Sequence, residues 1–456
     1  MKKFTLKQVA EACNGKFVGD EKYLDYPITS VERDSREIKE GSLFLAIKGA
    51  RVDGHGFIEK CYERGAICAL CEKAPENPQK PYILVNSTLD AVKQIAESYR
   101  GLFDIPVIGI SGSVGKTSTK EMIASVLSQK FKVHKTMGNL NNELGVPLTL
   151  FGLEEEHQAA VIEMGISDFG EMQRISKMVK PTICVITIIG SCHLENLGNR
   201  DGVLKAKTEM FENMTDNAKI ILNGDDDKLN TVKEVRGIKP EFYGLNSHNK
   251  YYAVNIQNNG TEGVDCTLCF NNTKLDVTIP ALGNYMVSNA LAAVAVGKSL
   301  GLSDEQLISG VESYKTVGSR ANLIKAQKVT IIDDCYNANP NSVKAAVDTL
   351  ANFSGRKVAV LGDMKELGKT ELQLHNEIGE YAVQKKIDIV IAVGPLAKEI
   401  FAGAENEKGT TKAVYFETIE KAQEKLKEHL KEGDTVLVKA SHSMQFEKIV
   451  NYLKQI

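Results

Sequence analysis

Short continuous runs of apolar residues alternate with segments of helical spacing through the middle of the chain. Four runs each predict a buried strand: PVIGIS (106–111), AAVIEM (159–164), TICVITII (182–189) and AKIILNG (218–224). The segment KTSTKEMIASVLSQKF (116–131), between the first two runs, has the apolar spacing of a helix. Continuous apolar strands that alternate with helices are typical of a parallel sheet covered on both faces.

The alternation continues on both sides of this segment. Towards the N-terminus we expect strands over 41–47, 66–71 and 82–86, with helices over 57–64 and 89–103. Towards the C-terminus we expect a second set of strands, at VTIIDD (329–334), KVAVLG (357–362), IDIVIAVG (387–394) and DTVLVKAS (434–441). Between the sets the strand signal weakens over 250–280, and a helix of small residues follows over 288–301.

A chain of 456 residues is too long for a single hydrophobic core. We therefore predict three α/β domains: a small N-terminal domain (1–86), a central domain with a mostly parallel sheet (87–317) and a Rossmann-like C-terminal domain (318–456).

Composition narrows the class of protein. Hydrophobic residues make up 43% and charged residues 25% of the chain, as in ordinary globular proteins. A net charge of −3 argues against a general nucleic-acid-binding surface. Because no apolar run approaches the roughly 20 residues of a membrane span and no signal peptide is evident, we expect a cytoplasmic protein. The nine cysteines include two close pairs, Cys68/Cys71 and Cys266/Cys269, which we expect to be buried thiols within strands.

Residues 109–120, GISGSVGKTSTK, resemble a phosphate-binding loop without its first glycine. The pattern G-x-x-x-x-G-K-[ST] would place that glycine at Ile110. The loop still lies between a buried strand and a helix, where backbone N–H groups and the helix N-terminus bind anions. We expect Lys116 to reach the β- and γ-phosphates of a nucleotide and Thr117 to ligate Mg²⁺. The P-loop comprises Gly112, Ser113, Val114, Gly115, Lys116, Thr117 and Ser118.

Two further residues follow neighbouring strands of the predicted sheet. Glu163 ends the strand after the P-loop helix, and His193 lies just beyond the next strand. The carboxyl ends of parallel strands meet at one edge of a sheet, where ligands bind. We therefore expect Glu163, His193 and the P-loop to share one site.

Several motifs together resemble the Mur ligases of peptidoglycan synthesis, whose ATP loop has this shortened form. They are DSR (34–36), DGH (53–55), NLNNELG (139–145), HLENLG (193–198), KAKTEMF (205–211), YNANP (336–340) and LGDMKELG (361–368). The resemblance covers essentially the whole chain, and YNANP with LGDMKELG are its most specific parts. It implies ATP-dependent ligation of D-alanyl-D-alanine to UDP-N-acetylmuramoyl-tripeptide through an acyl phosphate. We expect no nucleic-acid partner, no membrane span and a monomer.

The resemblance also implies a role for each matched position. Catalytic roles fall on Lys116, Lys207, His193 and Arg320. ATP contacts fall on the P-loop, Asn289, Arg320, Asp334 and Asn337. Contacts with the UDP-sugar and peptide fall on Ser35, Arg36, Asp53, Gly54, His55 and Asn142. Two Mg²⁺ ions would be held by Thr117, Glu163, His193 and Lys207, the last as a CO₂-derived carbamate.

The sequence departs from the family pattern at five positions and leaves two other functions open. The departures are Ile188, Tyr285, Met286, Ala440 and His442. One alternative is a sister ligase that adds a single amino acid, or a folate or polyamide ligase; YNANP and the absence of an Asp-Asn-Pro-Arg tetrad argue against it. The other is a nucleotide-binding regulator without catalysis, against which Lys116, Glu163 and His193 argue. Closure of the C-terminal domain would hinge near Val317–Gly318.

Overall fold

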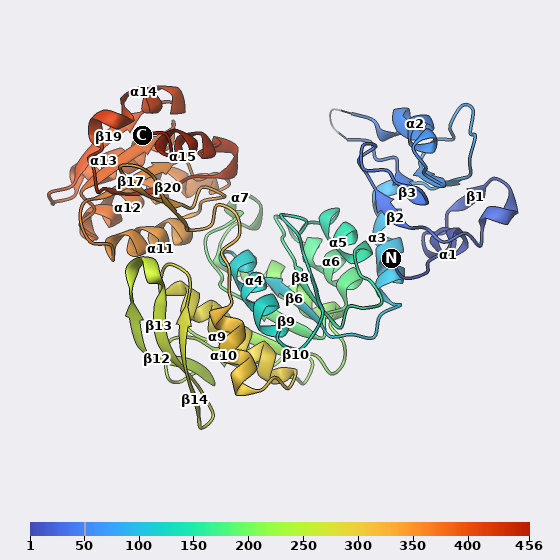
Figure 1. Cartoon of the computed structure of the whole chain (residues 1–456), viewed down its shortest axis with the longest axis horizontal. Coiled ribbons are helices and arrows are strands. Elements are labelled where there is room, and N and C mark those ends of the chain that lie inside the picture. Colours follow the sequence, from blue (N-terminus) through green and yellow to red (C-terminus); the bar gives the residue numbers. More distant parts are fainter. Residues whose placement is uncertain (50–51) are drawn as a thin grey trace.

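The computed structural model describes residues 1–49 and 52–456 and contains three α/β units, each with its own sheet. Figure 1 shows the N-terminal unit in blue at the upper right, the central unit below, and the C-terminal unit in orange and red at the upper left. The predicted fold class, α/β with three domains, is confirmed.

The N-terminal sheet has the strand order β1-β5-β4-β3-β2, parallel except for the β1–β5 pair. Its strands are β1 (Lys16–Val18), β2 (Ser30–Glu32), β3 (Ser42–Leu45), β4 (Cys68–Cys71) and β5 (Tyr82–Leu84). Its helices are α1 (Leu6–Ala12), α2 (Ile58–Glu63) and α3 (Thr88–Arg100), with short 3₁₀ turns η1 (Glu21–Tyr23) and η2 (Gly54–Phe57). The Thr5 side chain caps α1, and Gln8 returns the bond to the Thr5 backbone.

The central sheet has nine strands in the order β14-β13-β12-β11-β10-β9-β6-β8-β7. The parallel part consists of β6 (Val107–Ser111), β7 (Val133–Lys135), β8 (Ala159–Glu163), β9 (Ile183–Ile186), β10 (Lys219–Asn223) and β11 (Glu241–Tyr243). Successive residues of β6 point into different cores, since Val107 packs with α3 and α6 (Glu171–Val179), whereas Ile108 packs with α4 (Lys116–Leu127) and α9 (Tyr285–Ser299). Both faces of the sheet are therefore covered, as the continuous apolar runs predict.

The weak strand signal over 250–280 understates the amount of sheet in this region. Three strands occupy this region and extend the central sheet: β12 (Tyr251–Asn258), β13 (Val264–Phe270) and β14 (Thr273–Ile279). β12 joins β11 in parallel, and β13 and β14 follow antiparallel. The segment TKLDVTI of β14 alternates buried and solvent-facing positions, because only one face of this ribbon packs against the protein. The remaining central helices are α5 (Gly145–Phe151), α7 (Leu194–Leu197), α8 (Arg200–Thr208) and α10 (Asp304–Glu312).

The C-terminal sheet has the order β15-β16-β20-β17-β18-β19 and is parallel except for the β15–β16 pair. Its strands are β15 (Asn322–Lys325), β16 (Thr330–Asp333), β17 (Lys357–Gly362), β18 (Ile389–Val393), β19 (Lys412–Phe416) and β20 (Thr435–Lys439). Its helices are α11 (Pro340–Ala351), α12 (Glu371–Gln384), α13 (Lys398–Asn406), α14 (Ile419–His429) and α15 (Glu447–Leu453), with the 3₁₀ turn η6 (Gly368–Thr370).

The two connections between units differ in kind. At the first, α3 packs against α1 on one side and against α5 and α6 on the other. The Tyr99 hydroxyl, on α3, donates to Leu153 O at 2.7 Å and accepts from Lys2 N at 2.8 Å. At the second, Gly318 has φ +65° and an open surrounding, and Val317 is 47% exposed. The first junction is thus packed, and the second is an exposed segment without regular secondary structure. The domain boundaries at 86 and 317 stay predictions.

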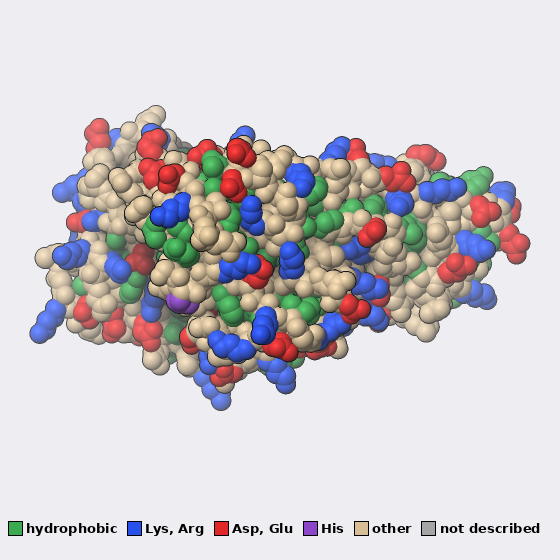
Figure 2. Space-filling model, turned by 90° about the horizontal axis from the view of Figure 1, so that it is seen from below, with side chains coloured by type: hydrophobic (Ala, Val, Ile, Leu, Met, Phe, Trp, Pro, Cys, Tyr) green, Lys and Arg blue, Asp and Glu red, His purple; other side chains and the backbone are tan. Residues whose placement is uncertain are grey.

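The surface carries charges of both signs, and the cysteines are buried. On the face drawn in Figure 2, basic and acidic side chains lie side by side over the length of the molecule. No helix among residues 1–49 and 52–456 combines the length and apolar character needed to cross a membrane. All nine cysteines are buried free thiols. Cys68 and Cys71 face different hydrophobic cores, as residues three apart in a strand should.

Candidate active site

The backbone of the P-loop depends on two glycines. Gly112 has φ +143°, and a Cβ there would lie 1.9 Å from Thr187 Oγ1. Gly115 has φ +84° and precedes α4. Ile110, where a longer loop would have glycine, is fully buried within β6 and pairs with β8 and β9. The first glycine is missing because that position still belongs to the strand.

Residues after β9 hold the P-loop from outside. Ser113 N donates to Ile188 O at 2.8 Å, and Thr187 Oγ1 donates to Val114 O at 2.5 Å. Ile188, a departure from the family pattern, thus supports the loop through its carbonyl group. Within the loop, Lys116 Nζ donates to Gly112 O at 2.8 Å, so the lysine folds over the cradle while remaining half-buried.

The structure joins Thr117 and Glu163. Thr117 Oγ1 donates to Glu163 Oε2 at 2.8 Å, and Glu163 is 1% exposed. A hydroxyl and a carboxylate at the start of the P-loop helix are hard oxygen donors of the kind that Mg²⁺ prefers beside phosphates. These residues therefore fit a nucleotide-bound Mg²⁺.

Two residues of this cluster escaped the sequence analysis. Asn141 Nδ2 donates to Glu163 Oε1 at 2.8 Å. Lys120 Nζ lies 3.7 Å from Glu163 Oε2, and Lys120 is 1% exposed. Lys120 follows Lys116 by one helical turn, and Asn141 lies in NLNNELG, but neither signal separates these residues from surface neighbours.

The predicted substrate contact Asn142 lies at the start of α5, where its Oδ1 accepts a hydrogen bond from Gly145 N at 2.8 Å.

Lys207 is a buried amine on α8. Its side chain is 1% exposed, and burial lowers the pKa of Lys207 to about 8, with a smaller contribution from the positive charge of Lys116. No described residue accepts a hydrogen bond from Lys207 Nζ. Lys207 is therefore a buried amine whose pKa is held below the ordinary lysine value, chiefly by its burial.

His193 points towards the C-terminal domain. It has φ +51°, and its Nδ1 lies 2.5 Å from Glu366 Oε2. Hydrogen-bonding interaction with the His193 ring lowers the pKa of the Glu366 carboxyl group. Among residues 1–49 and 52–456, no cluster of three or more His, Cys, Asp or Glu side chains is arranged to hold a metal. A shared metal site of Glu163 and His193 stays a prediction.

The predicted ATP contacts lie on both sides of the exposed Val317–Gly318 connection. On α9, Asn289 Oδ1 accepts from Thr119 Oγ1 at 3.0 Å, while Asn289 Nδ2 lies 3.2 Å from the sulfur of Met286. Met286, another departure, therefore buttresses the side chain beside the P-loop helix. The second group surrounds Asp334 in the C-terminal domain.

Asp334 is held by two groups of its own domain. Asp334 Oδ1 accepts from Ala321 N at 3.1 Å, and Asp334 Oδ2 accepts from Lys439 Nζ at 2.6 Å. The same ammonium donates to Asn337 O at 3.0 Å. The guanidinium of Arg320 lies 4.0 Å from the centre of the Tyr336 ring. Arg320, Asp334 and Asn337 are thus brought together on the hinge side of the C-terminal domain.

The C-terminal domain also contacts the P-loop directly. Asn339 Nδ2, in YNANP, lies 3.5 Å from Ser113 O, and Asn341 Oδ1 accepts from Ser191 N at 3.1 Å. In Figure 1, α11 lies at the lower edge of the C-terminal domain, where that domain meets the central one. The candidate site is therefore formed by two domains.

The predicted UDP-sugar residues lie apart from this cluster, in the N-terminal domain. Arg36 pairs with Asp34 at 2.6 Å. Asp53 Oδ1 accepts from His55 N at 3.0 Å and lies 2.6 Å from His55 Nδ1. A Cβ on Gly54 would lie 2.7 Å from Ile47 N. Ser35 O accepts from Arg64 Nη1 at 2.8 Å.

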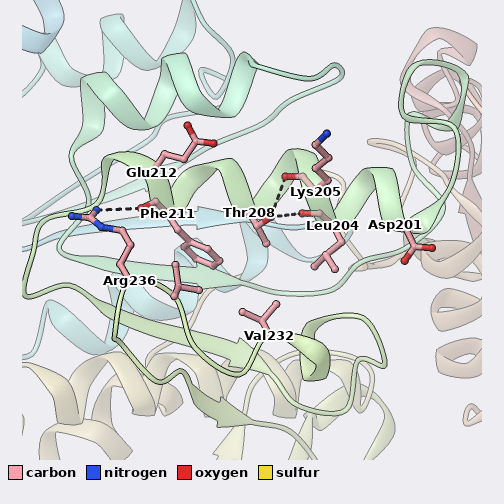
Figure 3. A pocket seen from close by; sticks show the side chains of 9 residues that line it. Asp201, Leu204, Lys205, Thr208, Phe211, Glu212, Val232 and Arg236 are labelled. Carbon is pink, nitrogen blue, oxygen red and sulfur yellow. Dashed lines mark hydrogen bonds between the residues drawn. The ribbon is translucent and has the colours of Figure 1, made fainter.

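A separate cavity of about 420 Å³ lies on the outer side of α8. Figure 3 shows its apolar side chains, Leu204, Phe211 and Val232, between α8 and the loop that carries Arg236. None of the predicted site residues lines it. This cavity is therefore distinct from the candidate active site.

Each of the three parts of the chain matches a known protein family. Three family profiles match: "Mur ligase family, catalytic domain" over residues 27–100, "Mur ligase middle domain" over 110–297 and "Mur ligase, glutamate ligase domain" over 319–442. The UDP-N-acetylmuramoyl-tripeptide–D-alanyl-D-alanine ligases of Bacillus subtilis and Escherichia coli are 36% and 34% identical to the chain. The alignments cover 99% of this chain in both cases, and 99% and 98% of those proteins.

Solved structures agree along the full length. A crystal structure of MurF from Acinetobacter baumannii has a TM-score of 0.91 at 32% identity, with both chains fully covered. MurF from Thermotoga maritima, crystallised with ADP, has a TM-score of 0.83 at 30% identity and covers 93% of this chain and 97% of its own. Because all three domains match in order and over nearly their whole length, the chain belongs to the Mur ligase family.

Proposed function

We propose that this protein joins D-alanyl-D-alanine to UDP-N-acetylmuramoyl-tripeptide at the expense of ATP, forming the pentapeptide precursor of peptidoglycan. The observation that carries the proposal is full-length similarity to ligases of that name, 36% identical over 99% of the chain. The P-loop and the buried Thr117–Glu163 pair supply the matching ATP chemistry. The Mur ligases are ATP-dependent enzymes that form peptide bonds.

The reaction needs an activated carboxyl group, because a carboxylate is a poor electrophile. A carboxylate oxygen of the tripeptide attacks the γ-phosphorus, the bond to the bridging β,γ-oxygen breaks, and ADP leaves. The amine of D-alanyl-D-alanine then attacks the acyl carbon, phosphate leaves with the bonding electron pair, and the amine loses a proton. Lys116 and Arg320 shield the two anions that meet in the first step.

Thr117, Glu163, His193 and Lys207 would hold two Mg²⁺ ions. When bound, such ions neutralise charge on the transferring phosphoryl group. The support is the oxygen pair of Thr117 and Glu163, at 2.8 Å, next to the anion-binding end of α4.

Lys207 would take part as a carbamate. Its neutral amine adds to the carbon of CO₂, a nitrogen–carbon bond forms, and a proton is released to give an anionic oxygen donor. Three properties of Lys207 favour this reaction: its burial, its pKa of about 8 and the absence of a hydrogen-bond acceptor among the described residues. An ammonium beside two Mg²⁺ ions would instead be repelled.

The three domains would divide the substrates. Residues 1–86 would bind the UDP-sugar through Ser35, Arg36, Asp53, Gly54 and His55, with Asn142 nearer the peptide. Residues 87–317 would bind the phosphates, and residues 318–456 would complete the nucleotide site and hold D-alanyl-D-alanine. Asn289, Arg320, Asp334 and Asn337 would contact ATP. Such an enzyme would work as a cytoplasmic monomer. Aligning three reactants across domains is worth up to about 7–11 kcal/mol when orientation is good.

The test compares acceptors. Purified protein is given ATP, Mg²⁺ and UDP-N-acetylmuramoyl-tripeptide, and phosphate release and product mass are followed with D-alanyl-D-alanine or with single amino acids. We expect turnover and the dipeptide mass increase with D-alanyl-D-alanine alone. Turnover only with a single amino acid would identify a sister ligase, and nucleotide binding without turnover would identify a regulator; either result overturns the proposal.

A further inference from the structure

One contact between the central and C-terminal domains involves a predicted metal ligand. His193 Nδ1 is buried, and Glu366, 2.5 Å away in the LGDMKELG segment, is the acidic group within ion-pair range of it among residues 1–49 and 52–456. Nδ1 has no hydrogen-bond partner among the described residues. The ring is therefore close to a carboxylate from another domain, and its other nitrogen makes no hydrogen bond to a described residue.

The backbone is unusual on both sides of this contact. His193 and Glu366 have φ values of +51° and +64°, in the left-handed region that side chains other than glycine rarely adopt. Such conformations persist only where surrounding structure enforces them, and they cluster at functional sites. His193 and Glu366 both have a positive φ, and they contact each other across the boundary between the central and C-terminal domains. We infer that this contact is part of how the two domains pack.

Further contacts with the C-terminal domain hold the loop that carries His193. Gly368, with φ +63°, lies so close that a Cβ would be 3.4 Å from the backbone of Glu195. On the other side, Ser191 N donates to Asn341 Oδ1 at 3.1 Å. The loop 190–195 is thus held by the C-terminal domain at two separate places, with His193 between them.

We propose that Glu366 is an interdomain positioning residue that orients His193 for metal binding only when the C-terminal domain is docked. The inference rests on the proposed function, because it takes His193 as a metal ligand. A metal-binding histidine commonly donates its second ring N–H to a carboxylate or carbonyl oxygen, which fixes the tautomer and ring orientation. Glu366 supplies that oxygen from the domain that must close, and docking thereby becomes coupled to completion of the metal site.

The test measures metal affinity as well as activity. Mn²⁺ binding is followed by electron paramagnetic resonance in the presence of a non-hydrolysable ATP analogue, for the wild-type chain and for Glu366→Gln. Loss of a carboxylate partner of a metal-binding histidine costs roughly 10–100-fold in affinity. We expect at least a roughly 10-fold weaker Mn²⁺ affinity in Glu366→Gln. The Mg²⁺ concentration for half-maximal turnover should rise, while kcat at saturating Mg²⁺ stays near the wild-type value.

Glu195→Gln is the matched control. It removes the same charge two residues from His193, and its exposed carboxylate has no partner among the described residues. We expect Mn²⁺ affinity within about twofold of wild type in this control. Because the Glu366 side chain is 57% exposed, its replacement should leave the thermal midpoint unchanged, which separates positioning from folding.

A double-mutant cycle completes the test. In a His193→Gln background, Glu366→Gln should have no further effect on Mn²⁺ affinity, because its action passes through the ring. Equal affinity in Glu366→Gln and wild type, or an undiminished effect of Glu366→Gln without the histidine, would overturn the inference. Neither result depends on the tripeptide or D-alanyl-D-alanine, so a failure of the proposed ligation would be seen separately in the acceptor assay.

Discussion

The two predicted binding regions of this protein are built in different ways. The P-loop is held by residues far away in sequence, including Thr187, Ile188 and Asn339. In the UDP-sugar region the contacts are nearer in sequence: the Asp53 and Arg36 side chains bond to groups two residues away, while His55 reaches Glu72 and Ser35 reaches Arg64. A site held by long-range contacts keeps its groups oriented before the ligand arrives, which is what charge stabilisation in a transition state needs. A site made of exposed turns contributes mainly to binding.

The largest loss of activity is expected at Lys116. We expect Lys116→Ala to lower kcat by roughly 10³-fold or more, because cationic groups on a transferring phosphoryl group act mainly on the transition state. Its ammonium bonds only to Gly112 O within the loop, so thermal unfolding should change little. Phosphate release and a melting curve measure both. A near-normal kcat with only a raised KM for ATP would show that this role is wrong.

The next largest loss of activity is expected on substitution of Lys207. We expect Lys207→Ala to lose most activity and a small carboxylic acid at high concentration to restore part of it by filling the vacated anionic position. Lys207→Arg should fail as well, since a guanidinium keeps its charge and does not take up CO₂. Full activity of the arginine variant would exclude the carbamate.

Lys207 also predicts a pH dependence. Its pKa in the folded protein, about 8, is below the ordinary lysine value of about 10.4. Below about 8 the ammonium dominates and CO₂ uptake falls, so at limiting CO₂ activity should rise with pH through this range. The unfolded chain binds the extra proton between these two values, so this group's contribution to the free energy of unfolding should also rise there. Activity assays at fixed low CO₂ measure the first effect, with the Lys207→Ala variant as control.

Two glycines, one in each binding region, allow ATP binding and UDP-sugar binding to be perturbed separately. In Gly112→Ala, the new Cβ would lie 1.9 Å from Thr187 Oγ1 at a backbone φ of +143°. Strain of this kind costs roughly 1–3 kcal/mol, and here it falls on the phosphate cradle. We expect a raised KM for ATP with little change in that for the UDP-sugar. Gly54→Ala, which places a Cβ 2.7 Å from Ile47 N, should show the opposite pattern. Equal effects on both substrates from either variant would contradict a division between the two regions.

The smallest effect is expected at Asp53. Its side chain caps η2, and Asp20 caps η1 in the same way, each accepting from the backbone two residues on. Both Asp→Ala variants should lose a similar, small amount of stability. Only Asp53→Ala should raise the KM for the UDP-sugar substrate. If both variants leave that KM unchanged, the DGH motif serves turn formation alone.

Much of the fold follows from the sequence, because buried parallel strands are continuous apolar runs. The strands at 107–111, 159–163 and 357–362 lie where those runs predict them. Of the ribbon β12–β14, the sequence indicates only the strand around Cys266 and Cys269, which is almost continuously buried, whereas β14 alternates buried and solvent-facing positions and gives no continuous apolar run. The Thr273–Ile279 segment shows this alternation plainly, and a period-of-two criterion would have found it.

The site follows from the sequence only in part. The P-loop is a local pattern, and Glu163 is found because it ends a strand beside it. Contacts such as Asn339 with Ser113, or His193 with Glu366, join residues more than 170 positions apart. No local pattern fixes such distances, because they depend on how the C-terminal domain docks.

The central claim is that the P-loop transfers the γ-phosphoryl group of ATP to a carboxylate held across the domains. It is tested most directly by labelling the terminal carboxylate of the tripeptide with ¹⁸O and analysing the released phosphate by mass spectrometry. An acyl phosphate requires one carboxylate oxygen to remain on phosphorus when the amine displaces phosphate. We predict one ¹⁸O atom in each phosphate released with D-alanyl-D-alanine as acceptor. Peptide bond formation with unlabelled phosphate would contradict the account.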